Sequence, residues 1–329
     1  MRGAGPVQVR PPATHANPLT LLSDPSNPTP SPGIGAPARA HFDRGFRFEQ
    51  GGLLERALDA YRDGLVASTT SAEAAEANLR IARIYRSMNN WAESKQASAQ
   101  AIQLARQARA DDLIAEAMNI EVGALQVQGY FEAADAIAVR ALDHARSPRI
   151  RGITLQNLGR GAAERGDFVT SDRYFNESIR YFRQANYDLG LAIALGNVAR
   201  AALDRGDVHR AIELGDEAIA LARRLNALDL LLTGVQNQAA AFAAAGRHEL
   251  AEALLTEALG HFTSAGNLVR QAECLELMGE LSAQRSEEGD TATRCFTRAL
   301  ALATSANDRR LVERLSKRLG LESARARSE

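Results

Sequence analysis

The sequence predicts an all-α protein in which about seven helical hairpins stack into a superhelical solenoid. Three observations predict this fold. Turn residues recur every 37 or 40 positions, the segments around each turn have the apolar periodicity of helices, and helix breakers are almost absent elsewhere beyond residue 37. A single hairpin cannot bury its own apolar face, so neighbouring hairpins must pack against one another.

The first 37 residues differ in composition from the rest of the chain. Nine of the ten prolines lie there, and only Pro148 lies beyond. Because proline lacks a backbone N–H and clashes with the preceding helical turn, we expect residues 1–37 to form a disordered arm. The arm is either a solvated tail or a segment that docks on the folded part or on a partner, with its one apolar cluster, residues 17–22, as the anchor.

Each hairpin is predicted from a turn and from small residues on the two helices beside it. Small residues seven positions before the turn and twelve after it would let the helices approach closely. Turns are expected at Gly52, Asn89, Gly129, Gly166, Gly206 and Gly246, with a slightly longer one at residues 287–290. The small residues before the turns are Gly45, Ala82, Gly159, Ala199, Ala239 and Gly279, and Val122 is the exception.

This pattern resembles the tetratricopeptide repeat. Its signature positions in residues 38–68 are Gly45, Phe48, Gly52, Ala57, Tyr61 and Gly64. The resemblance covers residues 38–306 and implies a right-handed superhelical solenoid whose first helices line a concave groove. The chain departs from the family at Val122 and Gly215, where a small residue and an aromatic are preferred. Within residues 307–329, the amphipathic segment 308–321 predicts a capping helix and the remainder a frayed tail.

An asparagine recurs in the first helices at intervals of forty residues, as Asn157, Asn197 and Asn237. Asparagine costs roughly half a kcal/mol relative to alanine in a helix, so a merely solvated face would favour other residues. On a helical wheel Asn157 lies opposite the packing face formed by Leu155 and Leu158. Two interpretations stay open: a solvated face, or a row of amides that donate to and accept from a bound peptide backbone.

The family resemblance favours the second interpretation. The forty-residue form with Asn-Leu-Gly is similar to repeats of kinesin light chains, of the Leu-Gly-Asn spindle adaptor and of bacterial receptors for signalling peptides. In those groups, asparagines at this position bind the backbone of a peptide. Carried over by position, the resemblance implies a peptide-binding row of Asn157, Asn197 and Asn237, with Asn119 displaced by one position and Gln156 and Gln236 beside the row.

Charged residues share the predicted groove face. Arg160 and Arg200 are expected to pair with Glu164 and Asp204, one helical turn further on. Other arginines would make the start and middle of the groove basic, namely Arg80, Arg83 and Arg86. The seventh repeat would add the acidic residues Glu273, Glu276 and Glu280. A groove basic toward one end and acidic toward the other would orient a peptide, whereas unrelated surface charges are the alternative.

No residue pattern indicates catalysis or a bound cofactor. The sequence lacks a Gly-rich phosphate loop, histidines at metal-binding spacing and a Gly-x-Ser-x-Gly motif, and its two cysteines, Cys274 and Cys295, are too few for a disulfide framework or a four-ligand zinc site. A net charge of −1 gives no support for nucleic-acid binding. No apolar run approaches the ~20 residues of a membrane span, and no secretory signal is recognisable. We therefore expect a cytoplasmic, non-enzymatic protein that needs no metal.

The leading hypothesis is an adaptor whose groove binds a peptide segment of a partner protein. One alternative is a regulatory sensor, whose groove binds a signalling peptide or the protein's own N-terminal arm. A second alternative is a structural protein that assembles with copies of itself into a homo-oligomer.

Overall fold

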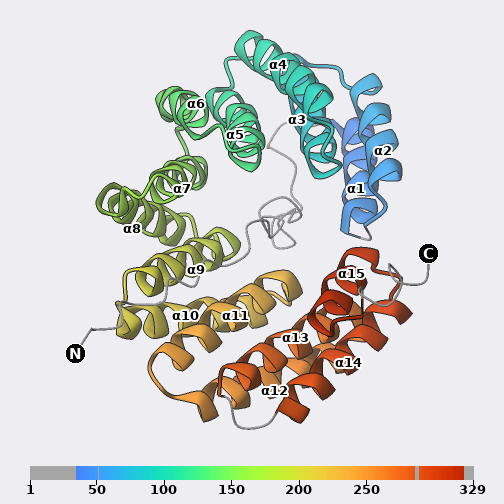
Figure 1. The fold of residues 1–329 in the computed structure, drawn as a ribbon. Coiled ribbons are helices and arrows are strands. Elements are labelled where there is room, and N and C mark those ends of the chain that lie inside the picture. The colour runs from blue at the N-terminus through green and yellow to red at the C-terminus, as the bar shows by residue number, and fades with distance from the viewer. Residues whose placement is uncertain (1–34, 51, 286–288, 322–329) are drawn as a thin grey trace.

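The computed structural model describes residues 35–50, 52–285 and 289–321. In this part of the chain there are fifteen α-helices and no strand, and the helices wind in pairs into a superhelix (Figure 1). The predicted fold class is confirmed. The expected arm up to residue 34, the middle of the seventh turn and the expected frayed tail lie outside the described residues.

Seven hairpins follow one another along the chain, each made of a first and a second helix. In order, they are α1 (Ala36–Gln50) with α2 (Leu54–Val66), α3 (Ser71–Ser87) with α4 (Trp91–Gln107), α5 (Asp111–Val127) with α6 (Phe131–His144), α7 (Pro148–Glu164) with α8 (Phe168–Gln184), α9 (Asp188–Asp204) with α10 (Val208–Arg224), α11 (Leu228–Ala244) with α12 (His248–Ser264), and α13 (Leu268–Gln284) with α14 (Gly289–Ser305). The capping helix α15 (Arg309–Arg318) packs on α14. Helix α1 begins at Ala36, two residues before the expected start of the solenoid at residue 38, with Pro37 in its first turn, where a missing N–H costs no helical hydrogen bond.

The six predicted turns that lie among the described residues are all left-handed at the expected residue. Gly166, for example, has a φ of 79°, and Asn89 has a φ of 60°. Glycine adopts this region without steric cost, and asparagine tolerates it better than most residues. The turn closes the preceding helix, because the N–H of Gly166 donates to the carbonyl of Ala163 over 2.9 Å. The periodic turn signal therefore has a local backbone cause.

Small residues at the helix crossings make room for aromatic rings. A Cβ atom on Gly159 would lie 2.9 Å from the ring of Phe175, and one on Gly279 would lie 2.6 Å from the ring of Phe296. Real Cβ atoms do not come this close to carbon atoms, so only glycine fits at these crossings. The predicted close approach of the two helices in a hairpin is confirmed there.

The two departures from the repeat pattern are compensated by neighbouring side chains. Val122 is fully buried and packs on Ala134 and Ala138 of α6, whose small side chains leave space for it. At Gly215, the space of the missing aromatic is filled by Gln238 of α11. The amide of Gln238 donates to Asp216 Oδ1 over 2.7 Å and to the carbonyl of Ile212 over 3.1 Å. Neither departure interrupts the solenoid.

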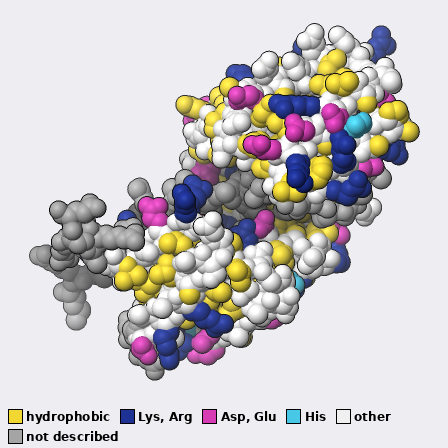
Figure 2. All heavy atoms as spheres, turned by 90° about the vertical axis from the view of Figure 1, so that its right-hand side faces the viewer, with side chains coloured by type: hydrophobic (Ala, Val, Ile, Leu, Met, Phe, Trp, Pro, Cys, Tyr) yellow, Lys and Arg dark blue, Asp and Glu magenta, His cyan; other side chains and the backbone are white. Residues whose placement is uncertain are grey.

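The first helices form the inner wall of the superhelix and the second helices lie outside them (Figure 1). Consecutive first helices pack side by side, from α1 on α3 to α11 on α13. We call their surface toward the centre of the superhelix the inner face; it corresponds to the predicted groove. Both ends of the superhelix lie on one side, and acidic and basic side chains alternate over that side (Figure 2).

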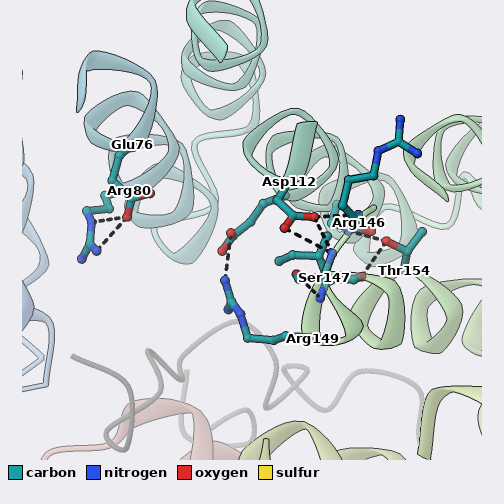
Figure 3. A network of polar contacts seen from close by, with 10 residues as sticks. Glu76, Arg80, Asp112, Arg146, Ser147, Arg149 and Thr154 are labelled. Atoms are coloured by element: carbon teal, nitrogen blue, oxygen red, sulfur yellow. Dashed lines mark hydrogen bonds and ion pairs between the residues drawn. The ribbon is translucent and has the colours of Figure 1, made fainter. Parts of the chain in front are cut away.

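A polar clamp joins the third hairpin to the fourth (Figure 3). The carboxylate of Asp112, at the start of α5, accepts from the backbone N–H of Arg146 over 2.7 Å and of Ser147 over 3.0 Å. Ser147 then caps α7, because its Oγ accepts from the N–H of Ile150 over 3.4 Å. Pro148 follows at the first position of the helix, where proline is tolerated.

Glu73 fixes the point at which the chain enters the first helix. Its nearly buried carboxylate accepts from the N–H of Gly35 over 2.6 Å, of Thr69 over 2.6 Å and of Thr70 over 3.2 Å. These hydrogen bonds, first those from Gly35 and Thr69, hold the pKa of Glu73 below its usual value. The ionised form of Glu73 is therefore the stabilising one.

We expect Glu73→Gln to destabilise the protein at neutral pH and to weaken its acid sensitivity. Because the folded-state pKa is depressed, the stabilisation by Glu73 is complete above its unfolded-state pKa of about 4.3 and is lost as the pH falls through the folded-state pKa. Urea unfolding at pH 7 and at about pH 3 measures this, and the variant should lose less stability on acidification than the wild type. Equal losses in the two proteins would contradict the assignment.

Candidate functional site

The predicted site residues lie on five consecutive first helices. Their positions are Arg83 on α3, Asn119 on α5, Gln156, Asn157 and Arg160 on α7, Asn197 and Arg200 on α9, and Gln236 and Asn237 on α11. Since α3, α5, α7, α9 and α11 pack side by side, these residues form a band across the inner wall. The band thus spans residues more than 150 positions apart in the chain, with each helix of the band in contact with its neighbours in the band.

Asn157 is part of the packing between two hairpins, which the helical wheel does not predict. Its side chain is only 7% exposed, and its Nδ2 donates to Oδ1 of Asn119 over 3.0 Å. Asn119 in turn donates to Oγ1 of Thr154 over 2.8 Å. A wheel of one helix leaves out the neighbouring first helix, and α5 packs on this side of α7. The amide of Asn157 therefore holds α5 and α7 together.

Arg160 pairs with Gln126 and not with the expected Glu164. Its Nε donates to Oε1 of Gln126 over 2.8 Å, and the Nε2 of Gln126 donates to the carbonyl of Asn157 over 2.8 Å. Burial lowers the pKa of Arg160 to about 10, and the negative charge of Glu164 acts in the opposite direction. The expected pair of the next repeat is present, with Arg200 Nε 3.0 Å from Asp204 Oδ1.

Four of the predicted site residues carry a buried nitrogen that no described residue accepts from. The four atoms are Nε of Arg83, Nε2 of Gln156, Nη1 of Arg160 and Nδ2 of Asn197. Buried polar atoms are nearly always hydrogen-bonded, and each one left unsatisfied costs about 1–3 kcal/mol. All four are N–H donors on inner-wall helices. The band therefore offers donors and fits a ligand rich in acceptor oxygens.

Several arginines at the start of the band form ion pairs with carboxylates. Arg83 Nε lies 3.4 Å from Glu49 Oε1, and Tyr61 donates its hydroxyl to Glu49 Oε2 over 2.8 Å. Arg80 Nη2 lies 2.7 Å from Glu76 Oε1. A third pair, between Arg149 and Glu116, joins α7 to α5 over 3.1 Å. Two of these pairs join neighbouring hairpins, the first to the second and the third to the fourth, and the Arg80–Glu76 pair lies within α3.

Sequence comparisons give no relatives: no protein-family model matches the chain, and no curated protein is significantly similar to it. Solved structures do resemble it. A Rap protein complexed with competence and sporulation factor is 16% identical with a TM-score of 0.57, over 89% of this chain and 76% of that one. A STAND protein with a tetratricopeptide repeat sensor from Pyrococcus horikoshii is 11% identical with a TM-score of 0.61, over 84% of this chain and 44% of that one. A tetratricopeptide repeat protein from Parabacteroides merdae is 14% identical with a TM-score of 0.50, over 86% and 98%.

The fold is that of a tetratricopeptide-repeat solenoid. Identities of this size establish the fold alone, so the binding chemistry has to come from this chain's own residues. The predicted resemblance to tetratricopeptide repeats is confirmed.

The acidic end predicted for the tetratricopeptide-repeat groove is wrong, because arginines neutralise it. Glu276 Oε2 lies 2.7 Å from Nη2 of Arg314, and Arg318 pairs with Glu280, both arginines coming from the capping helix. Arg270 pairs with Glu273 and with Asp229 of the preceding repeat. Two carboxylates of α13 therefore pair with α15, and Arg270 of α13 pairs with α11, so Glu273, Glu276 and Glu280 are neutralised by arginines among the described residues and do not form an acidic end.

Sequence reasoning missed two residues that shape the band, Glu49 and Gln126. Each lies three positions before its turn glycine, and Arg86 has the equivalent position in the second repeat. An alignment of this position across the tetratricopeptide repeats would have shown three polar residues in succession. Examining one helix at a time could not show this, because the three residues become neighbours only after the repeats stack.

Other chemistry receives no support from the part of the chain that the structure describes. No group of three or more His, Cys, Asp or Glu side chains there is placed to hold a metal ion. None of the described helices combines the length and the apolar character needed to cross a membrane. Cys274 is buried, and burial raises the pKa of its thiol to about 12, so this thiol is poorly nucleophilic.

We expect Asn157→Ala to lower the free energy of unfolding by about 1–3 kcal/mol, because Oδ1 of Asn119 would lose its donor inside the α5–α7 contact. Asn197→Ala, at the same position one repeat later, should change stability by no more than about 0.5 kcal/mol, since it removes a donor that has no described acceptor. Urea unfolding monitored by circular dichroism compares the two. Equal destabilisation would show that the Asn119 contact is not the cause.

Proposed function

We propose that this protein is a non-enzymatic adaptor that binds a peptide segment of a partner protein along the inner face. The observation that carries the proposal is a set of three buried N–H donors without described acceptors on α7 and α9, carried by Gln156, Arg160 and Asn197. The fourth buried donor, Arg83 Nε, already faces Glu49 in an ion pair. A peptide backbone presents one carbonyl oxygen per residue and needs no particular side chain to do so. Binding a peptide would give these donors the acceptors that the described part of the chain does not supply.

Two further features support a peptide as the ligand. Asn197 and Asn237 occupy the same position on neighbouring helices and are both half-buried, as expected for residues that contact an occupant of the inner face. The similar Rap protein is complexed with competence and sporulation factor, and the similar archaeal protein has a sensor made of tetratricopeptide repeats. A protein of similar fold thus forms a complex with a separate factor.

A random-peptide display library, selected on the full-length protein, tests the proposal. We expect peptides that bind the wild type and lose about tenfold or more in affinity for the double variant Asn197→Ala, Asn237→Ala, since two amides that contact the backbone are removed. Asn157 is left intact, because its amide stabilises the fold. Asn176→Ala, an exposed asparagine on the second helix α8, is the control.

A selection in which no peptide binds would contradict the adaptor proposal. Equal affinity of the selected peptides for the double variant and for the Asn176→Ala control would contradict it as well. Circular dichroism of each variant has to show native helix content, so that a loss of binding reports on the inner face.

The second candidate is a regulatory sensor whose inner face is occupied by its own N-terminal arm. The observation in favour is the hydrogen bond of 2.6 Å from Gly35 to Glu73, which holds the first described residue at the beginning of α3, the helix that also carries Arg83. Deleting residues 1–34 separates the candidates. Autoinhibition predicts tighter binding of a selected peptide, whereas a passive tail predicts unchanged binding.

A further inference from the structure

Two arginines, Arg86 and Arg160, converge on one turn of α5. The guanidinium of Arg86 lies over Gly123, where a Cβ atom would come within 2.7 Å of its Nη1. Arg160 reaches the same turn from α7 and donates to Gln126, which lies three positions after Gly123 on the same side of the helix. Burial, and next the positive charges of Arg83 and Arg160, lower the pKa of Arg86 to about 10. These charges are therefore close enough to repel one another.

Arg160 differs from the other inner-wall arginines in its partner. Carboxylates lie within 4 Å of three of those arginines, in the pairs Glu76–Arg80, Glu49–Arg83 and Glu116–Arg149. Arg160 has the neutral amide of Gln126, and its Nη1 is buried without an acceptor among the described residues. Repulsion between charges partly removed from water is weakly screened, so an anion placed here would be strongly stabilised.

Gly123 is the residue that permits this arrangement. Six positions before the turn, α3 carries Arg83 and α7 carries Arg160, whereas α5 between them carries Gly123. Any side chain at this position would take the space that the Arg86 guanidinium occupies. The missing side chain thus lets Arg86 lie beside the Gln126–Arg160 contact, so that two guanidinium groups are presented together.

We propose that Arg86 and Arg160, with Arg83 next to them, bind a carboxylate of the peptide on the inner face, either an Asp or Glu side chain or the C-terminal carboxylate. This inference rests on the proposed peptide binding and adds the class of peptide. A carboxylate offers about four acceptor sites, and guanidinium groups match it with paired donors. It would supply the acceptor that Arg160 Nη1 needs, while the nearby donors of Gln156 and Asn197 hold adjoining backbone carbonyls.

The peptides selected on the wild-type protein provide the probes, and Arg160→Gln is the test variant. Glutamine removes the charge but keeps an amide that can bond to Gln126. Arg180→Gln is the control, because Arg180 is an exposed arginine on the second helix α8, outside the band, and its charge is paired with Glu177. Each acidic peptide is compared with its Glu→Gln or Asp→Asn version and with its C-terminal amide, which tells the two sources of carboxylate apart.

We expect the selected peptides to share an acidic group, and Arg160→Gln to weaken their binding about tenfold, while Arg180→Gln changes it less than about twofold. The neutral version of each peptide should bind the wild type and Arg160→Gln equally. Selected peptides without an acidic group, or equal affinity of an acidic peptide for the wild type and Arg160→Gln, would overturn the carboxylate site and leave the adaptor function standing.

Inorganic sulfate tests the arginine cluster without a peptide. At matched ionic strength, sulfate should raise the melting temperature of the wild type and of Arg180→Gln more than that of Arg160→Gln. An equal rise in the three proteins would overturn the anion site. If no peptide binds but the sulfate effect depends on Arg160, the adaptor proposal fails and the anion site stands.

Discussion

Replacing Gly152 by alanine lowers the stability of the solenoid, whereas the same replacement of Gly196 raises it. A Cβ atom on Gly152 of α7 would lie 2.6 Å from the ring of Phe182, which is fully buried. The ring also lies against α9, because a Cβ atom on Gly190 would lie only 2.8 Å from the same ring atom. Phe182 of α8 is thus packed against a glycine of its own hairpin and a glycine of the next, which limits how far the ring can shift.

The sign of each change in stability follows from comparing the cost of overpacking with the gain in helix propensity. Overpacking a filled core costs about 1–3 kcal/mol, while alanine gains up to about 1 kcal/mol over glycine in a helix. Gly196 of α9 has no atom within 4 Å of its Cβ position, so only the gain applies there. We therefore expect the two variants to differ by about 1–3 kcal/mol, with the wild type between them.

Urea unfolding of the two alanine variants measures the difference, and hydrogen exchange locates it. Amides of α7, α8 and α9 should exchange faster in Gly152→Ala, because the strain lies at their common contact. A Gly152→Ala protein as stable as Gly196→Ala would mean that the Phe182 ring has room to move.

Replacing Glu276 by alanine releases the capping helix. The carboxylate of Glu276 is 6% exposed and accepts from Arg314 through Nε over 2.9 Å and through Nη2 over 2.7 Å. Breaking a fully buried ion pair costs about 3–5 kcal/mol. The side chain of Arg314 is 42% exposed, so solvent screening reduces our expectation to about 1–3 kcal/mol. At ten residues, α15 is too short to persist undocked in water.

Hydrogen exchange of residues 309–318 measures this release. Glu257→Ala is the control, since Glu257 pairs with Arg223 over 2.9 Å between exposed side chains, where an ion pair contributes no more than about 1 kcal/mol. Unchanged protection of α15 in Glu276→Ala would show that Leu311 and Leu315, which are both buried, hold the helix without the ion pair.

The hairpins were predictable from sequence because their signals are local. A glycine at the turn adopts a left-handed φ, as Gly206 does at 80°, and this preference depends on no distant residue. The small residue seven positions before it faces a second helix that follows within the same hairpin. Both requirements recur with each repeat, so the sequence displays them several times over. The band of site residues on the first helices was predictable for the same reason.

The partners of the site residues were not predictable, because contacts between repeats determine them. Asn157 meets Asn119 and Arg160 meets Gln126 across more than thirty residues of chain, and neither pair shows in the pattern of one helix. Glu276 was expected in an acidic groove end, but Arg314 of α15 pairs with it and neutralises its charge. The sequence by itself determined the repeat, its turns and the helices that carry the site. Only the tertiary structure decided which amides and charges are neutralised by neighbours, since an electrostatic or hydrogen-bonded pair requires proximity that stacking alone creates.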